Sequence, residues 1–281
     1  MRLRPAPHTR TRIPSYSLKI TPETHFINWQ QDPHGNWLAR LVFPERTTEF
    51  SVTVDLTAEM TVINPFDFFT EPYAETMPFA YADDVAGDLI PYLQVDEDGP
   101  LLQAAVDALK PAGQGTVNFL VGLNAELQQR TKYLVRMEPG VQTPDETLSL
   151  GSGSCRDSAW LLVQMMRKLG LAARFVSGYI YSPFSDPNHR GRIGGGHTHA
   201  WVRVYLPACG WVEFDPTNGI VGNTDLVRVA IARDPKQALP LWGSWAGLPS
   251  DYLGMDVEVD VHAESEDTEQ LTVQRAVGMA S

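Results

Sequence analysis

Three side chains from separate stretches of the chain have the types that thiol-based acyl transfer requires. Cys155 follows a Gly-Ser-Gly-Ser run, His199 opens an apolar stretch, and Asp215 stands just before a proline. A thiolate can attack an amide carbonyl, a histidine can take the thiol proton and later give one to the leaving amine, and a carboxylate can fix the histidine tautomer. This order of nucleophile, base and orienter predicts a Cys-His-Asp site for amide hydrolysis or acyl transfer.

Cys155 is predicted to stand at the first turn of a buried helix. Gly153 and Ser154 interrupt the chain before it, and Gly170 follows where a left-handed helix cap would sit. Between them, apolar residues recur at helical spacing: Ala159, Leu162, Val163, Met166 and Leu169. A helix start presents unpaired N–H groups and partial positive charge, which favour a thiolate and can later hold an oxyanion. Because Gly153 and Ser154 are small, we also expect them to let a substrate approach the thiol.

Two strand-like stretches, residues 200–206 and 211–214, predict a hairpin that brings His199 to Asp215. Side chains alternate along a strand, so the two residues share a face if the loop leaves an odd number of residues unpaired. They would then lie opposite or diagonal to each other, roughly 5 to 8 Å apart between β-carbons. Trp201 shares the face of His199 and is expected to wall the site against water.

Some neighbouring residues allow a different chemistry. His197 and His199 point the same way from a strand, and with Asp215 they could ligate zinc. That interpretation leaves Cys155 without a role, so we expect no metal or cofactor, and we expect His197 to line the cleft. The glycines at 194–196 suggest a phosphate cradle, but no P-loop lysine follows them, and a flexible lip over the cleft is the better interpretation.

Two further questions concern the thiols and the oxyanion. Cys209 stands between Pro207 and Gly210 in the predicted loop and is expected to be an incidental turn residue. A second oxyanion donor is not assigned, because neither Tyr133 nor Gln142 has a decisive spacing from the nucleophile.

The composition excludes several classes of protein. With 281 residues and 43% hydrophobic content, the chain can bury a full core. A balance of 22 basic against 34 acidic side chains gives a net charge of -12, which disfavours nucleic acid as a partner. No apolar stretch is long enough to span a bilayer, and the basic start leads into Pro14 rather than a signal core, so no membrane partner is expected and a cytoplasmic location is the default. Two cysteines are too few for a disulfide framework.

The chain divides into four segments by pattern. Residues 1–70 contain short β-branched and aromatic runs broken by turn signals, which predicts a small β-sandwich-like module. Residues 71–110 are rich in proline, aromatics and acids without a clear period, and are predicted to be a connecting segment. Residues 111–263 form the predicted catalytic core, and residues 264–281 an acidic tail.

Within the core, helices and strands are expected at defined places. Apolar spacing predicts a helix through Gln129 with Thr116 as its cap, and Thr143 with Glu146 three residues later predicts a capping box. Strands are expected at residues 173–181 and 255–261, in addition to the hairpin.

These stretches resemble the core motifs of the transglutaminase-like superfamily, in its bacterial cysteine-protease type. The motifs occur in the family order, and they are Gly153-Ser154-Cys155-Arg156-Asp157-Ser158-Ala159, His199-Ala200-Trp201 and Trp211-Val212-Glu213-Phe214-Asp215-Pro216-Thr217-Asn218. The amino-terminal β-rich section resembles the module that precedes this core in bacterial members. The resemblance implies an α+β, papain-like fold with an antiparallel sheet packed on the nucleophile's helix. It also implies that Cys155, His199 and Asp215 form a triad.

The leading hypothesis is therefore an enzyme that acts on a protein or peptide substrate through an acyl-thioester on Cys155. Water would resolve the thioester in a protease and an amine in a transglutaminase, and the sequence leaves this choice open. The alternative hypothesis is a non-catalytic peptide-binding module in which the triad is a relic. The natural substrate and the oligomeric state are also open.

Overall fold

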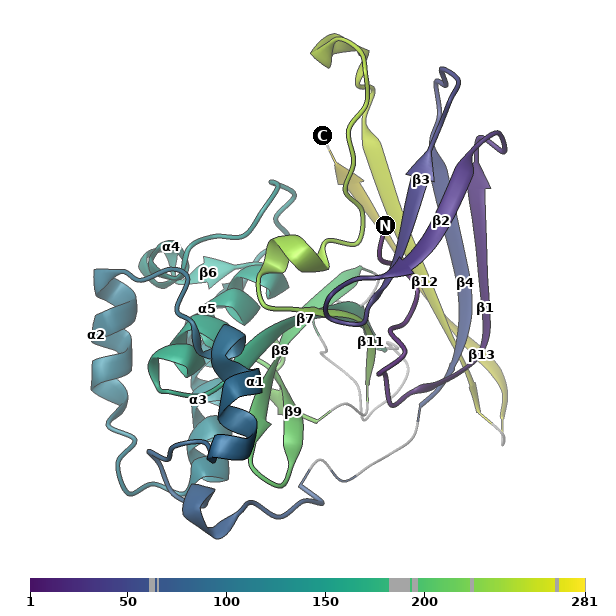
Figure 1. Cartoon of the computed structure of the whole chain (residues 1–281). Coiled ribbons are helices and arrows are strands. Elements are labelled where there is room, and N and C mark those ends of the chain that lie inside the picture. Colours follow the sequence, from purple (N-terminus) through teal and green to yellow (C-terminus); the bar gives the residue numbers. More distant parts are fainter. Residues whose placement is uncertain are drawn as a thin grey trace.

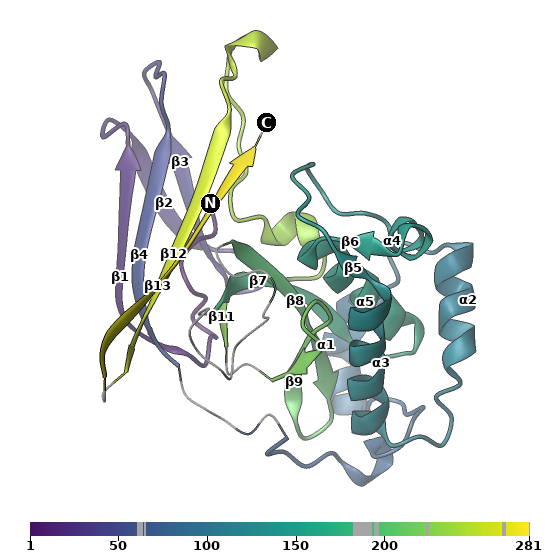
Figure 2. The same ribbon diagram turned by 180° about the vertical axis from the view of Figure 1, so that it is seen from behind.

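The structure, a computed structural model, consists of three layers. It describes residues 1–60, 64, 66–181, 193, 197–222, 225–265 and 268–280, and only the backbone beyond residue 261. A five-stranded sheet lies in the middle, the helices cover one of its faces, and a group of paired β-strands lies on the other side (Figures 1 and 2). The predicted α+β fold, with a helix carrying the cysteine on an antiparallel sheet and a β-rich module before it, is confirmed.

Four strands form the amino-terminal module. Strand β1 (Arg12–Thr21) pairs antiparallel with β4 (Ser51–Glu59), and β2 (Phe26–Gln31) pairs antiparallel with β3 (Trp37–Val42). Along β4, half-buried and exposed residues alternate, as the sequence predicts. The module has its own small core of Met1, Ile20 and Ala39.

A further hairpin lies alongside this module. Strand β12 (Met255–Ser265) pairs antiparallel with β13 (Thr268–Ala280), next to β1 and β4 in both views (Figures 1 and 2). The predicted strand at 255–261 is therefore longer than expected, and most of the segment 264–281 belongs to a paired strand rather than to a tail. The alternation of Leu271 and Val273 with polar neighbours is the sequence signal for this strand.

The segment 71–110 is not merely a connection, which corrects the sequence-based prediction. After the short 3₁₀ helix η1 (Pro72–Ala74), it forms α1 (Asp83–Leu93) and α2 (Pro100–Leu109). Helix α1 contains an internal proline and buries only Leu89, so its sequence shows little helical periodicity of apolar residues. Helix α2 buries Leu102 and Val106, which lie four residues apart and join the main core.

The next helices match the predicted positions more closely. Helix α3 (Thr116–Arg130) buries an apolar stripe, but its N-cap is Gly115. Thr116 instead donates its hydroxyl to the carbonyl oxygen of Ala74 at 2.6 Å, so the predicted threonine cap is wrong. Helix α4 (Pro144–Leu150) begins with the predicted capping box of Thr143 and Glu146.

The central sheet has the strand order β10-β9-β8-β7-β11, and its neighbouring strands run antiparallel. The strands are β7 (Ala173–Ile180), β8 (Thr198–Leu206), β9 (Gly210–Asp215), β10 (Ile220–Val221) and β11 (Leu226–Ala232). Helix α5 (Cys155–Lys168) packs on β7 and β8. Ala200, Val202 and Val204 of β8 share the main core with α5, so the alternate residues of β8 lie on the opposite face of the sheet.

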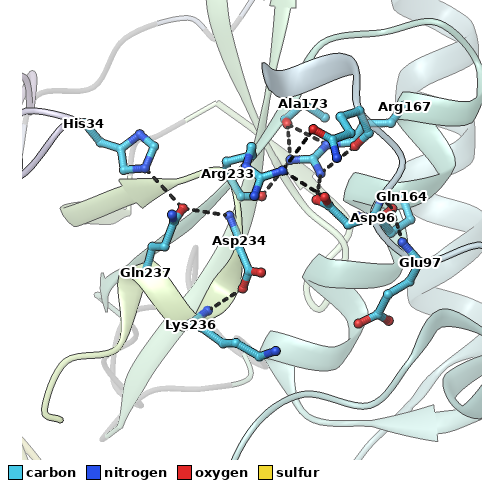
Figure 3. A network of polar contacts seen from close by, with 11 residues as sticks. His34, Asp96, Glu97, Gln164, Arg167, Ala173, Arg233, Asp234, Lys236 and Gln237 are labelled. Atoms are coloured by element: carbon cyan, nitrogen blue, oxygen red, sulfur yellow. Dashed lines mark hydrogen bonds and ion pairs between the residues drawn. The ribbon is translucent and has the colours of Figure 1, made fainter. Parts of the chain in front are cut away.

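A polar network fixes the far end of α5 (Figure 3). The guanidinium of Arg167 is fully buried and donates to Asp96 at 2.7 Å and to the carbonyl oxygens of Gln94, Ala173 and Arg233. Arg233 also donates to Asp96 at 2.8 Å. The helix end is therefore tied to β7, to the end of β11 and to the α1–α2 connection.

Asn36 connects the amino-terminal module to the sheet. Its side-chain amide accepts from the N–H of Ile231 at 2.9 Å and donates to the carbonyl oxygen of the same residue at 2.7 Å. Ile231 belongs to β11, an edge strand, so a side-chain amide takes the place of a neighbouring strand there. The short 3₁₀ helices η2 (Pro235–Ala238) and η3 (Pro249–Asp251) lie between this strand and β12.

Candidate active site

Helix α5 begins at Cys155, as the sequence predicts. Ser154 is its N-cap residue, and both the N–H and the hydroxyl of Ser154 donate to the carboxylate of Asp157, at 2.8 and 2.7 Å. The N–H groups of Cys155 and Arg156 lie in the first turn and have no acceptor within the helix. They are available to an anion next to the half-buried thiol.

His199 and Asp215 meet as a buried hydrogen-bonded pair. The distance from His199 Nε2 to Asp215 Oδ2 is 2.8 Å, and each residue is 1% exposed. The pairing of Leu206 with Gly210 leaves three residues in the loop, so the predicted odd loop and shared face are confirmed.

Further contacts fix the carboxylate of Asp215. The side-chain amide of Asn218 donates to Oδ2 at 2.8 Å, and the backbone N–H groups of Thr217 and Asn218 donate to Oδ1 at 2.9 and 3.3 Å. Sequence reasoning assigned no role to Asn218. The turn that follows the strand supplies these donors, and the signal for Asn218 was its place at the end of the third family motif.

The charges of the pair stabilise each other. Burial alone would lower the pKa of His199, but the charge and hydrogen bond of Asp215, together with Cys155, raise it above its ordinary value. Burial alone would raise the pKa of Asp215, yet His199, Asn218 and Thr217 hold it below its ordinary value. The pair therefore favours an imidazolium beside a carboxylate.

Cys155 is a neighbour of the free side of this histidine. His199 Nδ1 is buried and has no partner at hydrogen-bond distance within the described part of the chain, and Cys155 contributes to the raised pKa of His199. Burial and the same thiol raise the pKa of Tyr133 to about 12. The pKa shifts of His199 and Tyr133 thus both contain a contribution from Cys155, which indicates that the thiol is near both side chains.

Trp201 forms a wall behind the histidine. Its ring stacks on that of His199 with centroids 6.0 Å apart and an interplanar angle of 25°, and the residue has no exposed surface. It can contact a substrate only if it moves, so in this conformation it acts on His199. Gly178 makes room for it, because a Cβ at that position would lie 2.7 Å from Trp201 Cη2 and 2.1 Å from the carbonyl oxygen of Val227. No pattern in the sequence distinguishes Gly178 from other glycines.

The residues predicted to admit a substrate lie around the helix start. Gly153 is buried, and a Cβ there would lie 2.9 Å from both Asp157 Cβ and Gln142 Oε1. Gly153 and Ser154 therefore build the helix start, and substrate contact at them stays a prediction. His197 is half-buried at the entry to β8. The predicted lip at 194–196 lies outside the described residues.

A cavity of about 360 Å³ adjoins the site. It lies between the end of α3, the short strand β5 (Lys132–Tyr133) and the elements that carry the triad. Its wall includes Tyr133 beside the thiol, Ser158 one turn along α5, and Thr217, whose N–H holds Asp215.

The second cysteine and a metal centre were the other candidates. Cys209 lies in the loop between β8 and β9, and burial raises its pKa to about 11. Its thiol donates to the carbonyl oxygen of Phe69 at 3.3 Å. Within the residues that the structure describes, no three His, Cys, Asp or Glu side chains gather as metal ligands would. None of the described helices is long and apolar enough to cross a membrane.

Comparisons with known proteins agree with the fold. Residues 105–216 match the model of the transglutaminase-like superfamily, and residues 1–59 match the bacterial transglutaminase-like N-terminal region. The first match includes all three predicted triad residues. The boundaries of the four segments stay a prediction.

Relatives in bacteria and one solved structure extend the likeness to most of the chain. An uncharacterized protein of Mycobacterium tuberculosis is 26% identical over 267 residues, which cover 92% of this chain and 84% of that one. Another from Mycobacterium leprae is 33% identical over 107 residues, covering 38% of this chain and 37% of that one. A crystal structure from Cytophaga hutchinsonii, provisionally named a cysteine protease, has a TM-score of 0.65 at 18% identity and covers 100% of this chain and 85% of that one.

Proposed function

Because this chain belongs to the transglutaminase-like superfamily, we propose that it is a cysteine-dependent amide hydrolase or acyltransferase that acts on protein or peptide substrates. The observation that supports this proposal best is the buried pair of His199 and Asp215 beside a thiol at a helix start. Burying two opposite charges costs desolvation free energy unless both are well hydrogen-bonded. A hydrophobic core without a functional role therefore has no need of such a pair in this place.

The proposed reaction has two half-reactions. In the first, the Cys155 sulfur, as thiolate beside protonated His199, attacks the carbonyl carbon of a substrate amide. The N–H groups of the first turn of α5 hold the resulting oxyanion. His199 then gives its proton to the leaving nitrogen, the C–N bond breaks, and an acyl-thioester remains on Cys155.

In the second half-reaction, neutral His199 takes a proton from water or from an amine. That nucleophile attacks the thioester carbonyl, the C–S bond breaks, and Cys155 leaves as thiolate beside protonated His199. Asp215 keeps Nε2 protonated throughout, which leaves Nδ1 to exchange the proton with the reacting groups. Water gives hydrolysis, and an amine gives acyl transfer.

The test is incubation of the purified protein with a peptide containing glutamine and with dansyl cadaverine, analysed by mass spectrometry. Incorporation of the dansyl amine would show acyl transfer, and a new amino terminus would show peptide cleavage. We expect at least one product from the wild type and none from Cys155→Ala. No product from either protein, across a panel of unrelated peptides, would favour a binding module with an unused triad. A cytoplasmic location stays a prediction.

A further inference from the structure

Three apolar side chains are exposed on one short segment beside the candidate nucleophile. Leu134 is 42% exposed, Val135 63% and Met137 41%. Single exposed apolar residues are common on protein surfaces, whereas these three lie among four consecutive residues and so concentrate apolar surface in one place. We call residues 132–142 the strap.

The strap is anchored to the first turn of α5. Arg136, between two of the exposed residues, points inward and donates to Asp157 through Nε at 2.9 Å and through a terminal nitrogen at 3.0 Å. The N–H of Gln142 donates to the same carboxylate at 2.8 Å. Asp157 has no exposed surface, and these donors together with Ser154 outweigh burial and hold its pKa below the ordinary value.

A second arginine strengthens this attachment. Arg156, directly after Cys155, donates to the carbonyl oxygens of Arg136 and Glu138. Two residues in the first turn of α5 therefore hold the strap. Asp157 accepts hydrogen bonds from the strap, and Arg156 donates hydrogen bonds to its backbone. Because the strap is already fixed before a ligand binds, little conformational entropy of its backbone is lost when its apolar side chains make contacts.

The beginning of the strap runs next to the nucleophile. Strand β5 pairs in parallel with β6 (Ser152–Gly153), and the N–H of Leu134 donates to the carbonyl oxygen of Gly153 at 2.9 Å. Gly153 is two residues before Cys155. The preceding Tyr133 is close enough to Cys155 for the thiol to affect its pKa.

We propose that the strap is the acyl-donor subsite and that Leu134, Val135 and Met137 receive apolar side chains of an extended peptide. This inference rests on the proposed function, because it takes the reacting carbonyl to lie at the start of α5. An extended peptide advances about 3.3 Å per residue, so the residues just before that carbonyl reach a segment that begins beside Gly153. The occupant is therefore a peptide with one or two apolar residues near the acyl carbonyl.

The test uses two labelled peptides that differ only in having leucine or serine at the two positions before a central glutamine. Binding is measured by fluorescence anisotropy in the Cys155→Ala protein, so the result does not depend on turnover. We expect the leucine peptide to bind more tightly than the serine peptide. Adding Val135→Ser and Met137→Ser should weaken the leucine peptide by about tenfold and leave the serine peptide unchanged, as removal of apolar contacts would.

Ile90→Ser is the matched control, because Ile90 is 65% exposed on α1 and should change neither affinity. Circular dichroism melting of each variant checks that the fold is kept. Equal affinity for the two peptides, or the same preference with and without the strap substitutions, would overturn the proposal. If the preference depends on the strap but the wild type turns over no peptide, the strap binds apolar peptides, whereas the catalytic proposal fails and with it the role of the strap as an acyl-donor subsite.

Discussion

At the scale of single residues, the site depends on a charge pair that is buried completely. The carboxylate of Asp215 accepts hydrogen bonds from His199, Asn218 and Thr217, and the indole of Trp201 covers the imidazole. Both partners were predictable, because strand alternation and an odd loop place them on one face. The contacts of Asn218 and the space provided by Gly178 were not predictable, because they depend on turn geometry and on packing between strands.

Replacing the orienting carboxylate should reduce turnover without unfolding the protein. Asp215→Asn keeps the shape of the side chain but removes the charge that keeps His199 protonated, so kcat should fall by about 10²-fold or more. The measurement is kcat on whichever peptide the wild type processes, with a melting curve for each protein. Asn218→Ala, which removes one donor to the carboxylate, should cause a smaller loss. Unchanged kcat in Asp215→Asn would show that Asp215 does not orient the base.

The same pair predicts a pH dependence of stability. The pKa of His199 is higher in the folded state than the pKa of about 6.5 that it has in the unfolded chain. Protonated His199 therefore stabilises the fold fully at pH values below about 6.5, and this contribution is lost as the pH rises through the folded-state pKa. The difference in free energy of unfolding between wild type and His199→Gln should therefore shrink as pH rises above 6.5. Urea unfolding at a series of pH values measures it. A difference that stays constant or grows in this range would contradict the assigned charges.

At the scale of elements, one helix carries the nucleophile at one end and a polar anchor at the other. The periodicity of α5 and the capping sequences of α4 and α5 were predictable from local pattern. Helices α1 and α2 were not, since an internal proline and few buried side chains conceal their period. The network around Arg167 was also hidden, because two of its partners, Asp96 and Arg233, lie 71 and 66 residues away along the chain.

Breaking that anchor should destabilise the protein. Arg167→Met removes a fully buried guanidinium and leaves Asp96 and three carbonyl oxygens short of a donor, so the free energy of unfolding should fall by about 3 kcal/mol. Arg12→Met is the control, because the Arg12–Glu59 pair is exposed, and it should cost less than about 1 kcal/mol. Both values come from urea unfolding. Similar small losses in the two variants would show that the network does not hold the helix.

At the scale of the whole molecule, the amino-terminal module is attached to the edge of the sheet that carries the site. Its β2–β3 hairpin was predictable from alternation and turn residues, whereas the pairing of β1 with β4 was not. The position of the module was not predictable either, because one of the contacts that fix it is a side-chain amide that takes the place of a neighbouring strand at β11. Nothing in a local sequence pattern distinguishes this asparagine from one in an ordinary turn.

Asn36→Ala should weaken this attachment. The change leaves the buried N–H and carbonyl of Ile231 unpaired, which should cost about 2 kcal/mol. Hydrogen exchange followed by mass spectrometry should show faster exchange in β11, centred on Ile231. Asn28→Ala, on the exposed side of β2, is the matched control and should not change this exchange. Equal protection of β11 in both variants would show that Asn36 does not join the two parts.

The most direct test of the triad is the rate at which iodoacetamide alkylates each cysteine at pH 7, with the modified sites identified by peptide mass spectrometry. If His199 keeps the Cys155 sulfur as a thiolate, Cys155 should react much faster than Cys209, whose pKa of about 11 leaves it protonated. His199→Ala should remove most of that advantage. Equal, slow alkylation of the two cysteines, or an advantage that persists without the imidazole, would contradict the proposed triad.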